Sequence, residues 1–240
     1  MKIAIHQPHY LPWLGYLAKW ASADLFVFLD TVQYEKNGWQ NRNRIKTADG
    51  PRWLTVPVKA HLGMAVGVVP IDTSQPWRAR HLRAIENAYG KAPKWPRYRD
   101  ELRGFYAREW KHLAPLAVDS ARWLAGALGV TTPACLASEL AAADGPRGDP
   151  TARLVAICRA VGADTYLAGR DGALYLDADQ FAGAGIAVAT QRYEHPVYSQ
   201  GWGEFTPFLS SLDLLLMQGD EALGLLCEGN TWSPLSPEPG

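Results

Sequence analysis

MKIAIHQPHYLPWLGYLAKWASADLFVFLD, residues 1–30, decides the fold. Residues 2–6 and 24–30 are short, mostly apolar runs, which is typical of strands buried inside a parallel sheet. The segment between them, from Trp13 to Ser22, is long enough for only a short helix. The pattern therefore predicts a strand, a helix and a second strand, with a turn over residues 7–12 at the carboxyl end of the first strand.

Composition and charge narrow the class of protein. The chain has 240 residues, of which 48% are hydrophobic, so it can build one large core or one core with an appendage. Lys plus Arg and Asp plus Glu both number 24, so no overall charge draws the protein to nucleic acid or to an anionic membrane. Any contact with nucleic acid would have to be local.

The sequence gives no sign of membrane insertion or of metal binding. The N-terminus lacks the long apolar region of a signal peptide, and no run of about 18 apolar residues occurs. We therefore expect a soluble, cytoplasmic protein with no membrane partner. The three cysteines are widely spaced in apolar surroundings, which predicts buried, reduced thiols and no metal site.

The rest of the chain predicts a Rossmann-like α/β fold with a doubly wound, mostly parallel sheet, a helical insertion and a C-terminal helical segment. Residues 1–74 form the first half, with a polar loop over 31–50 and a hairpin of strands over 51–60 and 66–73. Apolar spacing near 3.6 makes 75–130 a helical insertion or cap. Strands and helices alternate again over 131–228, and 229–240 is a frayed tail.

The turn after the first strand has an unusual composition for a simple chain reversal. It carries His6, Gln7, His9 and Tyr10, and the following helix begins with Gly15 and Tyr16. In open α/β sheets, ligands bind beyond the carboxyl ends of the strands. A helix beginning there points free backbone N–H groups at the turn, which favours a phosphate or carboxylate. The alternative is that the histidines cap or pack the core.

Three further polar segments are predicted to reach the same edge of the sheet. Residues 30–46 are rich in amide and guanidinium donors suited to phosphate or sugar oxygens, although a solvated basic loop is the alternative. Residues 169–177 combine glycines with charges, and residues 194–200 include a histidine beside a glutamate, which suits a general base. The predicted site residues of these segments are Asp30, Gln33, Tyr34, Asn37, Trp39, Asn41, Arg42, Asn43, Arg44, Lys46, Gly169, Arg170, Asp171, Tyr175, Glu194, His195, Tyr198 and Gln200.

Several common catalytic motifs are absent from the sequence. It contains no Walker A loop, no GxSxG elbow, no GxGxxG after a strand and no HExxH. These absences argue against a P-loop kinase, a typical hydrolase, an NAD-linked oxidoreductase and a zinc protease.

Four segments in order, IAIHQPHYLPWLGY, ADLFVFLDTVQYEKNGWQNRNRIK, DTYLAGRDGALYLDADQFAGAGIAV and TPFLSSLDLLLMQG, resemble the WbqC-like protein family. The resemblance covers nearly the whole chain. It implies a link to O-antigen and other surface-polysaccharide synthesis, with transfer of glycine to a sugar as a suggested activity.

The start of the chain is also similar, more distantly, to the nucleotidylyltransferase superfamily that includes pantothenate synthetase. In that superfamily a His-x-Gly-His motif binds ATP phosphates. Here Trp13-Leu14-Gly15-Tyr16 falls at the corresponding place, so the glycine is kept and both histidines are not.

The resulting expectation is an enzyme that forms an amide bond, joining an amino acid such as glycine, or a small carboxylate, to an amine of an amino sugar or metabolite. If ATP with Mg²⁺ is the driver, the reaction passes through an acyl adenylate. His6, His9 and the helix start would bind phosphate, while Arg42, Arg44 and Lys46 would bind the leaving group. Glu194 with His195 would deprotonate the amine, and Asp30 would orient it. The alternatives are a transferase using a thioester, carrier protein or aminoacyl-tRNA donor, and a module that only binds a nucleotide sugar.

Overall fold

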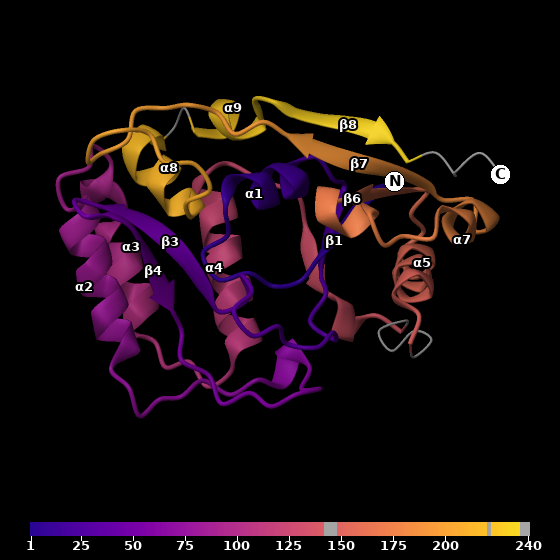
Figure 1. Cartoon of the computed structure of the whole chain (residues 1–240), viewed down its shortest axis with the longest axis horizontal. Coiled ribbons are helices and arrows are strands. Elements are labelled where there is room, and N and C mark those ends of the chain that lie inside the picture. The colour runs from indigo at the N-terminus through magenta and orange to yellow at the C-terminus, as the bar shows by residue number, and fades with distance from the viewer. Residues whose placement is uncertain (142–147, 220–221, 236–240) are drawn as a thin grey trace.

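The computed structural model describes residues 1–141, 148–219 and 222–235 (Figure 1). The opening segment folds as predicted, into β1 (Lys2–His6), α1 (Leu14–Ala21) and β2 (Leu25–Phe28). β1 and β2 pair in parallel, with Ile3 opposite Leu25. The strand–helix–strand unit is therefore confirmed.

A six-stranded sheet runs through the molecule in the order β5-β2-β1-β6-β7-β8. Its other members are β5 (Ala134–Leu136), β6 (Thr165–Ala168), β7 (Ala187–Tyr193) and β8 (Asn230–Pro234). β1, β2, β5, β6 and β7 are parallel, and only β8 runs antiparallel, against β7. The chain builds outward from β1 to β5 on one side and then crosses to β6 and β7 on the other. This doubly wound α/β order places the switch in strand order between β1 and β6.

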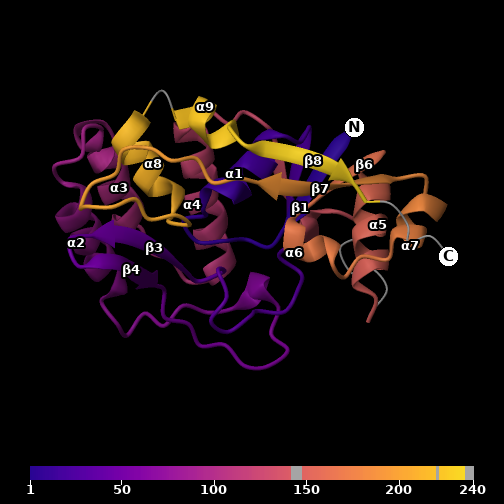
Figure 2. The ribbon, with the colours of Figure 1, turned by 45° about the horizontal axis from the view of Figure 1, so that its top comes forward.

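Helices cover both faces of the sheet (Figures 1 and 2). One core contains Ala4 and Phe26 from the strands and is covered by α1, α2 (Trp77–Tyr89), α3 (Trp95–Ala107), α4 (Leu113–Ala127), α8 (Ser211–Gln218) and α9 (Ala222–Cys227). The other core contains Ile3 and Ile5 and is covered by α5 (Pro150–Ala160), α6 (Arg170–Ala173) and α7 (Ala178–Gly183). Neighbouring residues of β1 thus face opposite layers, as strand geometry requires.

The hairpin does not lie where the sequence pattern predicts it. It consists of β3 (Arg42–Thr47) and β4 (Gly50–Thr55), joined through Ala48 and Asp49. The end of the expected polar loop, from Arg42 to Thr47, is thus strand, and Val66–Val68 is a short 3₁₀ helix, η1. The sequence pattern shows no apolar face in β3, because the buried Asn43 stands between cations, of which Arg44 and Lys46 form hydrogen bonds with residues 200–208.

Two other expectations are also corrected. Residues 230–234 are not frayed but form β8, which pairs with β7 from Ala189 to Tyr193. The thiols are all free, but Cys227 is exposed and only Cys158 is fully buried.

A second 3₁₀ helix, η2, spans Ala137–Glu139. In the described part of the chain, no helix is long and apolar enough to cross a membrane.

Candidate functional site

Lys19 lies at the switch in strand order and is the site residue that the sequence pattern did not reveal. It is 2% exposed, and its ammonium group donates a hydrogen bond of 3.1 Å to the carbonyl oxygen of Ile5, near the end of β1. A side chain at Gly169, directly after β6, would meet the same ammonium group at 3.7 Å. Lys19 therefore lies between the carboxyl ends of the two strands that flank the switch.

The charge on Lys19 is not neutralised by an acidic side chain. Burial lowers the pKa of its ammonium group from 10.5 to about 7. Among the described residues, no carboxylate forms an ion pair with Lys19. A buried cation without a counter-ion is costly, so an anionic ligand at this position would be strongly favoured.

Two histidines lie close to this lysine: His6, the last residue of β1, and His9, in the turn over residues 7–12 that follows it and is called the opening turn below. The rings of His6 and His9 lie 4.6 Å apart edge to face, and the ring of Tyr16 lies 4.6 Å from His6 and 5.1 Å from His9. Burial and the nearby Lys19 charge lower the pKa of His9 to about 3 and that of His6 well below its usual value. Both rings are therefore neutral at pH 7.

The ring nitrogens of these histidines are available to a ligand. His6 Nδ1 lies 3.2 Å from the carbonyl oxygen of Gln7, which only accepts, so the proton lies on Nδ1 and Nε2 carries the lone pair. His9 is 7% exposed, and its buried Nδ1 has no hydrogen-bond partner in the described structure. A buried polar atom without a partner in a native structure calls for a ligand or a water.

The polar residues of β3 hold the turn in its conformation. Leu11 has a positive φ of 46°, which a branched side chain rarely adopts. Its N–H donates to Ser120 Oγ at 2.9 Å, and its carbonyl accepts from the Asn43 amide at 2.6 Å. The N–H of Tyr10 donates to the carbonyl oxygen of Gln40. Asn43 thus fixes the backbone of the turn, and Asn41 likewise bonds the Val56 carbonyl oxygen.

Gly15 is required by the chain itself. A Cβ atom at this position would lie 2.2–2.6 Å from the indole of Trp13, which covers the start of α1. The sequence suggested that Gly15 lets a ligand come close to the backbone. In the structure, the group that lies close to Gly15 is the indole of Trp13. Tyr10, also predicted to bind substrate, is fully buried and hydrogen-bonds Tyr106 and His81.

Part of the loop after β2 reaches the opening turn. The amide of Gln40 donates to Gln7 Oε1 at 2.7 Å, and Gln7 donates to Glu35 at 3.3 Å. Other predicted residues of this loop precede Gln40 and do not contact the turn in the described structure: Gln33 pairs with Ala65 in a β-bridge, Tyr34 is buried, and Asn37 has a φ of 65°. Asp30 is engaged elsewhere, because both of its carboxylate oxygens accept hydrogen bonds from Ser138, at 2.6 Å and 3.0 Å.

Lys46, Tyr198 and Gln200 belong to a separate buried network. Asp213, on α8, accepts hydrogen bonds from Tyr89 at 2.8 Å and from Tyr198 at 2.9 Å. Lys46 donates to Gln200 Oε1 at 3.0 Å. These groups tie the hairpin to α2 and α8, and all of the strong donors are used within the protein.

The predicted pair of Glu194 and His195 is not a hydrogen-bonded pair. Glu194 is exposed and forms an ion pair with Arg192 at 3.2 Å. His195 lies among the rings of Tyr193, Tyr198, Phe205 and Phe208, and burial lowers its pKa. Its buried Nε2 has no partner in the described structure. Phe208 also contacts Trp13, which connects this aromatic group to the opening turn.

The segment after β6 presents its side chains to solvent. Gly169 is the residue nearest to Lys19, while Arg170 and Asp171 on α6 are exposed. Tyr175 is 85% exposed. Of this predicted group, only Gly169 is brought to the switch point by the fold.

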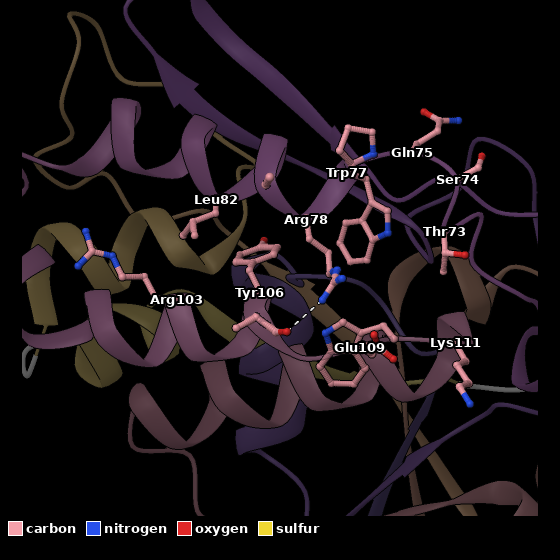
Figure 3. A pocket seen from close by; sticks show the side chains of 14 residues that line it. Thr73, Ser74, Gln75, Trp77, Arg78, Leu82, Arg103, Tyr106, Glu109 and Lys111 are labelled. Atoms are coloured by element: carbon pink, nitrogen blue, oxygen red, sulfur yellow. Dashed lines mark hydrogen bonds between the residues drawn. The ribbon is translucent and has the colours of Figure 1, made fainter.

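One cavity lies away from the switch point, between α2 and α3 (Figure 3). It has a volume of about 830 Å³ and is lined by residues of 73–82 and 103–111. Arg78 reaches across it and donates to the carbonyl oxygen of Ala107 at 3.0 Å. Arg103, at its rim, is paired with Glu86 at 2.9 Å. Two cations of this cavity are thus held within the protein, Arg78 by a backbone carbonyl group and Arg103 by a carboxylate.

Comparisons with known proteins cover nearly the whole chain. The model of the WbqC-like protein family matches residues 7–224. An uncharacterized protein of Mycobacterium tuberculosis, Rv1507c, is 35% identical over 225 residues, which cover 92% of this chain and 95% of the relative. No solved structure gives a significant match. On these matches, which span the opening turn, the sheet and the C-terminal helices, the chain belongs to the WbqC-like protein family.

Proposed function

We propose that this protein is an amide-forming enzyme that joins the carboxylate of an amino acid or another small acid to an amine of an amino sugar or small metabolite. The observation that carries the proposal is Lys19, a buried cation without an acidic partner, facing His6 and His9 at the switch in strand order. A site of this kind favours a carboxylate or phosphate and lies where α/β folds bind their ligands.

The residues fit the phosphates of ATP better than a resident metal. The Lys19 ammonium is a compact charge suited to phosphate oxygens, and the neutral imidazoles can donate or accept a hydrogen bond beside it. Among the described residues, no three His, Cys, Asp or Glu side chains are grouped so as to hold a metal ion. In this proposal Mg²⁺ arrives with the nucleotide and is held mainly by its phosphates.

The proposed reaction has two steps. A carboxylate oxygen of the acid attacks the α-phosphorus of ATP, and pyrophosphate leaves. The amine nitrogen then attacks the carbonyl carbon of the acyl adenylate, the bond to AMP breaks, and AMP leaves with the electron pair. His6 Nε2 carries a lone pair because Nδ1 is protonated, and it accepts a hydrogen bond from the amine, whose proton passes to solvent. Lys19 neutralises the charge that develops on the phosphate.

Exchange of labelled pyrophosphate into ATP, screened over the common amino acids with Mg²⁺, tests the first step. We expect exchange with glycine or another small amino acid, and a loss of about 100-fold or more in Lys19→Met. Lys2→Met is the matched control, because Lys2 is an exposed lysine on the same strand as His6. Absence of exchange with every acid would refute an adenylating enzyme.

A further inference from the structure

The protein has zero net charge, yet its charges are strongly segregated along the chain. Residues 36–111 carry 16 Lys or Arg and 6 Asp or Glu, a net charge of +10, which leaves −10 on the rest. This basic part holds the hairpin, α2 and α3, which lie together at one end of the molecule, opposite α5 and α7 (Figures 1 and 2). Cations therefore outnumber carboxylates in the elements at this end, although the whole chain has no net charge.

A groove at this basic end is lined by two exposed indoles. It has a volume of about 520 Å³ and lies between the tip of the hairpin and α2. Trp53 and Trp202, which line it, are 41% and 45% exposed. The indole N–H of Trp202 donates to the carbonyl oxygen of Ala88 at 2.8 Å, so this ring is held in place.

Cations and a third indole surround Trp53. The guanidinium groups of Arg42 and Arg44 lie 4.3 Å and 5.6 Å from its ring centroid, and the ring of Trp39 lies 5.5 Å away. Arg52 lines the same groove. In the described structure no acidic side chain pairs with these three arginines. Arg42 and Arg44 donate to the carbonyl oxygens of Asn37 and Phe208, which do not neutralise their positive charge, so that charge can attract a polyanion.

We propose that this groove binds an unpaired segment of RNA. Exposed aromatic rings stack on bases whatever their sequence, and arginines beside them contact the phosphates. The volume of the groove suits one or two nucleotides, while the excess of cations over residues 36–111 continues beyond the groove onto α2 and α3 and favours a longer polyanion. This groove lies at the hairpin and α2, apart from Lys19 and the opening turn, so RNA binding here does not depend on the proposed amide formation.

Fluorescence anisotropy with a labelled, unstructured RNA of about 12 nucleotides tests the inference. We expect binding that weakens about tenfold or more between 50 and 200 mM salt, because phosphate contacts release counter-ions. Trp53→Ala should weaken binding about fivefold or more, the usual effect of removing one stacked ring, and Trp53→Phe should largely restore it. Arg42→Gln with Arg44→Gln should weaken binding and flatten the salt response.

The control variant is Arg159→Gln, an exposed arginine on α5 at the opposite end, which should bind RNA as the parent does. Circular dichroism checks that each variant is folded. No binding at about 0.1 mM protein, or equal binding by Trp53→Ala, would overturn the proposal. Equal affinity for duplex RNA would also overturn it, as would full displacement by an equal concentration of AMP, which would make the groove a mononucleotide site.

Discussion

At the scale of single residues, Lys19 decides what the opening turn can bind. Its pKa of about 7 means that the ammonium form prevails below neutral pH and is lost as the pH rises. His6 and His9 stay neutral throughout this range, because burial holds their pKa values well below the usual value. Affinity for an anion should therefore follow Lys19 alone.

We predict that sulfate, whose own charge does not change between pH 6 and 8, binds progressively more weakly above about pH 7. If only the ammonium form binds, the affinity falls up to tenfold per pH unit beyond the pKa. Isothermal titration calorimetry at pH 6, 7 and 8 measures this. An affinity that is constant from pH 6 to 8 would show that Lys19 does not hold the anion.

Lys19→Met provides the companion measurement, because it should lose sulfate binding while gaining stability. The lowered pKa means that the unfolded chain binds a proton that the folded chain does not bind between about pH 7 and 10. The free energy of unfolding of the parent protein therefore rises with pH over this window. The variant should lack this rise and have a larger free energy of unfolding than the parent at pH 7. Weaker sulfate binding by the variant could therefore not result from unfolding.

At the scale of elements, β3 supports the turn that carries the histidines. We predict that Asn43→Ala lowers the free energy of unfolding by about 1–3 kcal/mol, because the buried Leu11 carbonyl loses its donor and the strained φ of Leu11 loses its restraint. Urea unfolding measures the change. Asn87→Ala, at an exposed position on α2, should cost little. Equal effects of both substitutions would mean that Asn43 does not hold the turn.

The parallel strands and the opening turn could be predicted from the sequence because buried strands are continuous apolar runs. β3 could not be predicted in this way, since its buried Asn43 donates its amide N–H group to the carbonyl oxygen of Leu11, which lies 32 positions away in the chain. The sequence contains one indication of the role of Lys19, because it is the only charged residue in the otherwise apolar helix LGYLAKWA. The direction in which the Lys19 side chain points depends on how α1 packs against β1 and β6, and no local sequence pattern reveals this packing.

At the scale of the whole molecule, the helical block over residues 75–130 is not a separate cap. Side chains of α2, α3 and α4 share one hydrophobic core with α1, β2 and α8. Tyr106 of α3 hydrogen-bonds Tyr10 of the opening turn, and Ser120 of α4 bonds the N–H of Leu11. The block therefore helps to shape the site.

This shared core leads to a prediction about folding. An isolated fragment of residues 75–130 should remain largely unfolded, because Leu116, Leu124 and their neighbours would face water instead of the rest of the core. In the whole chain, tryptophan fluorescence and far-ultraviolet circular dichroism should report one common urea midpoint. A fragment that gives dispersed amide signals in NMR and its own cooperative transition would instead establish the block as an independent domain. The conformation of the opening turn would then depend on β3 alone.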